Sequence, residues 1–122
     1  YVQYAHARIS NIIKLASERG LDLTTGNLEL LNNPNEIHLI RTMLQLPELV
    51  NQSARVFEPH HLPHYAVALS TAFHSFYENC RVVSANEEDY EISLARLKLV
   101  QATQVVLQRC LQLMGMNAPE SM

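Results

Sequence analysis

The sequence predicts an all-α fold, a helical bundle of about five helices that forms a single domain over residues 1–122. The composition suits helices, since the chain holds only three glycines, no tryptophan and 48% hydrophobic residues. Apolar residues recur at steps of three and four over long stretches, which is the helical period. No alternating pattern typical of a strand runs for more than a few residues. A chain of 122 residues has the length of one domain.

The first helix is expected over residues 1–19, and Gly20 follows it as a C-terminal cap. No capping residue precedes it, so we expect that this helix was cut from a longer chain. The next expected elements are a loop over 20–33 with a short turn at 28–31, and a second helix over 34–46. Its inward residues are predicted to be Ile37, Ile40 and Leu44. The first helix buries one apolar stripe, which consists of Val2, Ala5, Ile9, Ile12 and Ala16.

A third short helix is expected over 47–57 and a fourth over 60–80. A polar, acidic loop over 84–89 then leads into a long last helix over 88–114, which Gly115 ends. Apolar residues on two sides of this last helix indicate that it is central to the bundle. Cys80 and Cys110 are predicted to be buried, reduced core residues, and the alternatives are a disulfide or a reactive thiol. The buried face of the fourth helix is expected to consist of Tyr65, Leu69, Ala72, Phe76 and Cys80. The two stripes of the last helix are Ile92, Ala95, Leu99, Ala102, Val106, Cys110 and Leu113, and Leu97, Val100, Leu107, Leu111 and Met114.

Charge and motifs limit the possible functions. The net charge is −3, with nine Lys and Arg against twelve Asp and Glu, which argues mildly against binding through phosphate contacts alone. No uninterrupted apolar run reaches the roughly 18 residues of a membrane span. No phosphate loop, nucleophile elbow or dinucleotide fingerprint occurs, so the chain alone does not look like an enzyme.

The histidines His60, His61 and His64 leave a metal site open, although no further ligand motif supports one. His6, His38 and His74 are isolated and are expected at the surface or the core edge.

The first two turns carry Tyr1, Tyr4 and Arg8 on one stripe, at the edge of the buried face. Aromatic rings with polar tips and a guanidinium can stack on an unpaired base and hydrogen-bond its edge. The same residues can also be ordinary boundary packing with a snorkelling arginine. Tyr77, in the segment FYENCRV, points to a face beside the buried one. The apolar tail that ends on Met122 is either a packed contact or a fraying end.

Three separated motifs together resemble the C-terminal domain of arginyl-tRNA synthetases: YVQYAHARI at 1–9, FHSFYENCRVV at 73–83 and LMGMNAPESM at 113–122. The resemblance covers essentially the whole chain. It implies the helical DALR-type anticodon-binding fold. It also implies a parent enzyme, a class I arginine–tRNA ligase that uses ATP and magnesium in a catalytic domain upstream. The resemblance further implies that the partner is the anticodon loop of tRNA-Arg, while this chain itself carries no cofactor and no catalytic residue. We also expect a cytoplasmic protein, in keeping with two reduced cysteines, and a monomer, since the sequence gives no sign of oligomerisation.

Carried over position by position, the resemblance implies that the pocket for the middle anticodon base consists of Tyr1, Tyr4, Arg8, Tyr77 and Met122. Every arginine anticodon has cytosine in the middle, and a pocket of rings and a guanidinium suits cytosine. Ser121 stands where many family members carry a basic residue. With the net charge of −3, this substitution leads us to expect weak binding of the anticodon loop by this chain alone. The alternative function is a helical protein-interaction module that does not bind RNA.

Overall fold

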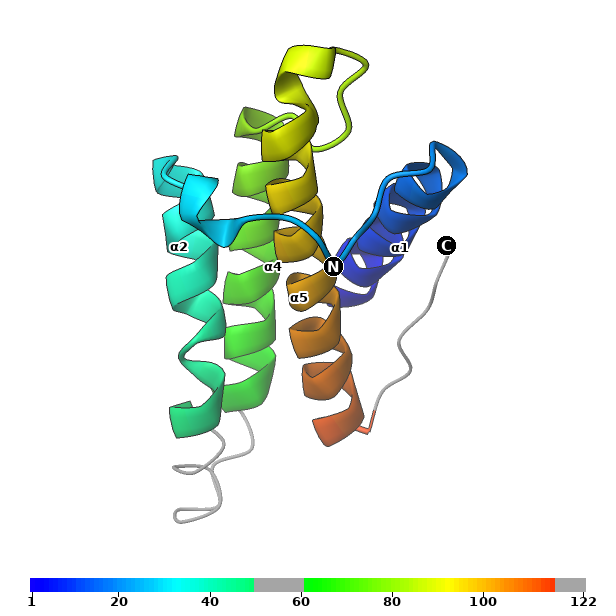
Figure 1. The fold of residues 1–122 in the computed structure, drawn as a ribbon. Coiled ribbons are helices and arrows are strands. Elements are labelled where there is room, and N and C mark those ends of the chain that lie inside the picture. Colours follow the sequence, from blue (N-terminus) through cyan, green and yellow to red (C-terminus); the bar gives the residue numbers. More distant parts are fainter. Residues whose placement is uncertain (50–60, 116–122) are drawn as a thin grey trace.

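The computed structural model describes residues 1–49 and 61–115, and within these ranges the chain is helical without a strand. The all-α prediction is therefore confirmed (Figure 1). Residues 46–49 are helical and begin the third helix expected over 47–57, whose remainder lies outside the described residues. The described elements are α1 (Val2–Glu18), the 3-10 turn η1 (Leu28–Leu30), α2 (Pro34–Met43), α4 (His61–Asn79), the 3-10 turn η2 (Glu87–Asp89) and α5 (Tyr90–Leu113).

Helix α5 lies in the middle of the molecule, with α1 on one side and α4 on the other, and α2 covers the far side of α4 (Figure 1). The central position predicted for this helix is confirmed. In the predicted stripe of Leu97, Val100, Leu107, Leu111 and Met114, the first four residues are completely buried and Met114 is half-buried. The other predicted stripe is less regular, because Ala102 is exposed. The polar Thr103 is buried instead, and its hydroxyl donates to the carbonyl of Leu99 at 2.9 Å, which satisfies it inside the helix.

Helix α1 ends at Glu18, just before the glycine that the sequence indicates as its cap. Gly20 has a φ of +74°, a left-handed conformation that costs glycine little. The amide of Gly20 donates to Ser17 O and the amide of Leu21 donates to Ala16 O, each at 3.0 Å. This pair of hydrogen bonds is the Schellman pattern, which closes the last carbonyls of a helix. The turn sends the chain back along the bundle towards η1.

Helix α2 buries a different face from the predicted one. Leu44 is 72% exposed and Ile37 and Ile40 are only half-buried, whereas Glu36 and Leu39 are fully buried. The prediction was wrong because it counted only apolar residues. The buried stripe of α2 begins with a charged residue and continues along the helical period with Leu39 and Thr42.

The buried carboxylate of Glu36 ties three segments together. Its Oε1 accepts from the amide of Asn33, which completes a capping box at the start of α2. Its Oε2 accepts from Arg96 Nε of α5 at 2.7 Å. In this ion pair the Glu36 side chain is only 1% exposed. Arg96 Nη1 also donates to the carbonyl of Arg81, just after α4, at 2.9 Å. One ion pair therefore fixes α2, α5 and the segment that leaves α4.

The buried face predicted for α4 is confirmed, since Tyr65, Leu69, Ala72, Phe76 and Cys80 are each at most 6% exposed. Cys80 and Cys110 are both buried free thiols, as predicted. Burial raises the pKa of Cys80, and it raises that of Cys110 to about 11. In the described part of the chain, no helix is both long and apolar enough to cross a membrane.

We predict that Gly26→Ala destabilises the fold. Gly26 is buried where the loop before η1 passes over α5, and a Cβ there would collide with the carbonyl of Leu94 and lie 2.7 Å from Ala95 N. Both obstacles are backbone, which cannot rotate away, so we expect a loss of unfolding free energy of ~1–3 kcal/mol or more. Urea denaturation measures this loss. Gly20→Asn is the matched control, since Asn tolerates a positive φ and nothing lies within 4 Å of the new Cβ. An equal stability of the Gly26 variant and wild type would contradict the close approach.

Candidate nucleic-acid interface

Two rows of polar and aromatic side chains face each other along the edge where α1 packs against α4. The first row consists of Tyr1, the N-cap of α1, and of Tyr4 and Arg8 on the helix itself; the three share one side because they are three and four residues apart. The row on α4 consists of Thr71, His74 and Tyr77 at steps of three. The two tyrosines of α1 are 62% and 52% exposed, so their rings are open to a ligand.

His74 lies at the centre of these two rows. The Tyr1 ring is 5.5 Å from the imidazole between centroids, and the Tyr4 ring is 6.0 Å away. The hydroxyl of Tyr1 forms a 3.1 Å hydrogen bond with Thr71 Oγ1, although the two residues are 70 positions apart in the sequence. Phe73 stands next to His74 and is completely buried, so the backbone beneath the imidazole is anchored in the core.

Arg8 lies between His74 and Tyr77. Its Cζ is 4.2 Å from the centroid of the Tyr77 ring, a cation–π contact. Its Nη1 donates to His74 Nδ1 over a long 3.5 Å contact. The guanidinium therefore covers one face of Tyr77, and a flat ligand that stacks on this face has to displace it.

The environment of His74 favours the neutral imidazole. Burial lowers the pKa of His74, the charge of Arg8 lowers it further, and Glu78 acts in the opposite direction. Since a guanidinium can only donate, the hydrogen bond from Arg8 also requires that Nδ1 carries no proton. His74 is thus uncharged at neutral pH, and Arg8 supplies the positive charge at the centre of the two rows.

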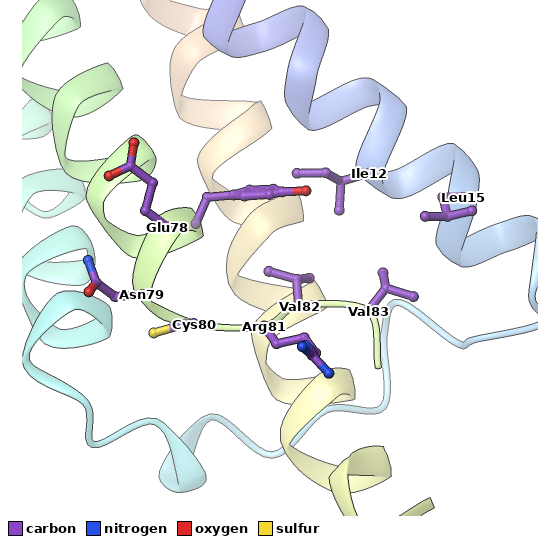
Figure 2. Close-up of a pocket in the computed structure, with 9 residues that line it drawn as sticks. Ile12, Leu15, Glu78, Asn79, Cys80, Arg81, Val82 and Val83 are labelled. Carbon is purple, nitrogen blue, oxygen red and sulfur yellow. The ribbon is translucent and has the colours of Figure 1, made fainter. Parts of the chain in front are cut away.

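A hollow of about 530 Å³ begins at Tyr77 and continues along the C-terminal half of α1. Figure 2 shows Ile12 and Leu15 of α1 on one side of it and Val82 and Val83 across from them. Its polar lining comes from the end of α4 and the residues just after it, namely Glu78, Asn79 and Arg81. The aromatic cluster therefore borders an open space, and the side of the bundle where α1 meets α4 is concave.

Four of the five residues expected to form a base pocket come together in this cluster: Tyr1, Tyr4, Arg8 and Tyr77. The fifth, Met122, lies outside the described residues, as does His60. No side chain is described for His61, so the histidine cluster expected as a metal alternative is not placed. Among the described residues, no three metal-ligating side chains gather.

Sequence reasoning missed His74 and Thr71. His74 does lie at the core edge as expected, but it is not isolated, because it contacts three of the predicted pocket residues. The spacing of 71, 74 and 77 was a usable signal, since these positions share a side of α4. His6 also differs from its expected place at the surface or core edge, because it is 3% exposed.

Comparison with known proteins identifies the family. The family model of the DALR anticodon binding domain matches residues 2–122. The chain belongs to this family. The arginine–tRNA ligase of Dehalococcoides mccartyi strain CBDB1 is 55% identical over all of this chain, and that of Moorella thermoacetica is 46% identical. Among solved structures, the Thermus thermophilus arginyl-tRNA synthetase matches the whole DALR chain with a TM-score of 0.82 and 32% identity.

The resemblance that the sequence motifs predicted is thus confirmed. The DALR chain spans only about a fifth of these proteins: 21% of the Dehalococcoides ligase, 22% of the Moorella ligase and 21% of the Thermus synthetase.

We predict that Arg8→Met raises the pKa of His74. The substitution removes the positive charge that opposes protonation, while the desolvation remains, so the pKa rises but stays below the ordinary value. An NMR titration of the imidazole Cε1–H measures it. Arg41→Met removes an exposed cation from α2 and is the control, for which no change is expected. An unchanged midpoint in the Arg8 variant would show that Arg8 does not face His74.

Proposed function

We propose that this chain binds the anticodon loop of tRNA-Arg and reads its middle base, cytosine. The observation that carries the proposal is the convergence of Tyr1, Tyr4, Arg8 and Tyr77, from helices far apart in the sequence, into one exposed cluster. Membership of an anticodon-binding family and similarity to arginine–tRNA ligases support the nature of the ligand. A cluster of rings around one guanidinium also suits an unpaired base better than a duplex.

The base needs a face on which to stack, and Tyr77 offers one. In the proposed complex, cytosine takes the place that the Arg8 guanidinium occupies over the Tyr77 ring. Stacking of a base on an aromatic side chain contributes ~1–3 kcal/mol and accepts any base. Stacking therefore supplies affinity, and the choice of cytosine has to come from the edge of the base.

Arg8 is the residue suited to read that edge. Once displaced from the ring, its donors can reach O2 and N3 of cytosine, both of which accept hydrogen bonds. Uracil presents an N–H at position 3, which faces the guanidinium as a second donor. Arg8 thereby favours cytosine over the pyrimidine of the same size. In this proposal the exposed rings of Tyr1 and Tyr4 hold the neighbouring part of the loop.

In this proposal the attachment of arginine takes place in another domain of the ligase. The chain acts within a longer cytoplasmic, monomeric arginine–tRNA ligase whose catalytic domain uses ATP and magnesium to attach arginine to the bound tRNA. Among the described residues no three metal-ligating side chains gather, and the sequence has no phosphate loop. The contribution of this chain is the choice of tRNA.

We predict that Tyr77→Ala weakens binding of tRNA-Arg by ~1–3 kcal/mol, or about 5- to 150-fold, because a stacking face is lost. The half-buried Tyr77 lies at the edge of the core, so the fold survives with little loss of stability. The measurement is kcat/KM for charging of tRNA-Arg by the full-length ligase, together with a thermal melt. Tyr90→Ala removes a tyrosine that is 49% exposed at the start of α5 and is the matched control. Normal charging by the Tyr77 variant would remove Tyr77 from the proposed site.

A further inference from the structure

The side chain of His74 contacts three of the four described residues in the proposed pocket. The rings of Tyr1 and Tyr4 pack on its imidazole, and Arg8 donates to its Nδ1. Its neighbour Phe73 is fully buried and fixes its position on α4. Because the backbone of His74 is held by the buried Phe73, its imidazole can fix the positions of the three pocket residues that contact it.

The contact with Arg8 uses only part of the guanidinium. Arginine has five N–H donors in a fixed planar fork, and the bond from Nη1 to His74 Nδ1 occupies one of them. The others remain free for a base. A hydrogen bond at one corner of the guanidinium restricts its orientation, so it limits how far Arg8 can turn when a base takes its place over the Tyr77 ring.

The hydrogen bond from Arg8 to His74 can form only while His74 is neutral. A protonated imidazole has two N–H donors and no acceptor, so Nδ1 can no longer accept from Arg8, and the two cations repel. In the part of the chain that the structure describes, the titratable or charged groups that face His74 are Arg8, Tyr1 and Tyr4 from the first helix, and Glu78 from its own helix. Among these, only Glu78 favours the protonated form, and burial and Arg8 together outweigh it.

We propose that His74 is a positioning residue that aims Arg8 at the edge of the middle anticodon base, and that protonation of His74 releases Arg8 and abolishes the choice of cytosine. This inference rests on the proposed function and adds a specificity-determining residue to it. Protonation brings a second positive charge to the site. Phosphates are the same in every RNA, so general affinity for RNA is retained or rises at low pH while discrimination between bases falls.

The test uses this 122-residue chain and two anticodon stem-loops of tRNA-Arg sequence that differ only at the middle base, C or U. NMR titrations, which detect weak binding, give the ratio of the two dissociation constants. The ratio is measured at about pH 7.5 and one unit below the midpoint found for the His74 imidazole, which lies below the ordinary value of about 6.5. We expect the preference for C to fall from roughly ten-fold to about two-fold or less.

Two substitutions separate the hydrogen bond from the packing. His74→Asn keeps an acceptor oxygen near the place of Nδ1 and does not titrate, so it is expected to prefer C equally at both pH values. His74→Phe keeps a ring for Tyr1 and Tyr4 but cannot accept from Arg8, so it is expected to lose the preference at both. His38→Gln removes an exposed histidine of α2 and is expected to retain the pH response of the wild type. Thermal melts verify that each variant is folded.

The outcomes are distinct. A preference for C in wild type that does not change through the His74 midpoint would overturn the inference and leave the proposed function intact. A folded His74→Phe variant that still prefers C at neutral pH would do the same. If the wild type shows no preference for C at any pH, the proposed function fails, and the inference fails with it.

Discussion

Helix α1 packs against α4 through small and apolar side chains, and this contact determines what the exposed edge of the bundle can do. Ala5 and Ile9 of α1 and Phe73 and Phe76 of α4 are all completely buried in one hydrophobic cluster. Burial at this density fixes the position of each helix along the other. The row of Tyr1, Tyr4 and Arg8 is consequently held opposite the row of Thr71, His74 and Tyr77, although none of these six residues belongs to the buried core.

A second constraint acts on the other side of the site. The chain leaves α4 through residues 81–83, two of which line the hollow beside Tyr77 with their valine side chains. This segment is held by Arg96, whose guanidinium bonds the Arg81 carbonyl and is itself held by the buried Glu36. Removing one partner of such a pair leaves a buried charge without compensation, which costs several kcal/mol. The wall of the hollow is therefore coupled to the start of α2, on the far side of α4.

The sequence alone correctly predicted the structural features that depend on a single helix or turn. The positive φ of Gly20, the buried face of α4 and the burial of both cysteines all follow from local composition and spacing. Prediction from the sequence failed for features that depend on contacts between two helices far apart in the chain. The face of α2 follows from a pair between Glu36 and Arg96, and counting apolar residues cannot predict a buried carboxylate. Spacing placed Tyr1, Tyr4 and Arg8 on one side of a helix. Only the packing of α1 on α4 shows that His74 lies among them.

We propose that the edge between α1 and α4 binds an anticodon loop with cytosine in the middle. The most direct test is an NMR map of the isotopically labelled chain on addition of tRNA-Arg, repeated with a tRNA whose middle anticodon base is not cytosine. We expect shift changes centred on Tyr1, Tyr4, Arg8 and Tyr77 with the first RNA and much weaker ones with the second. Absence of changes at these four residues, or equal changes with both RNAs, would contradict it. Complete absence would favour the alternative of a protein-interaction module.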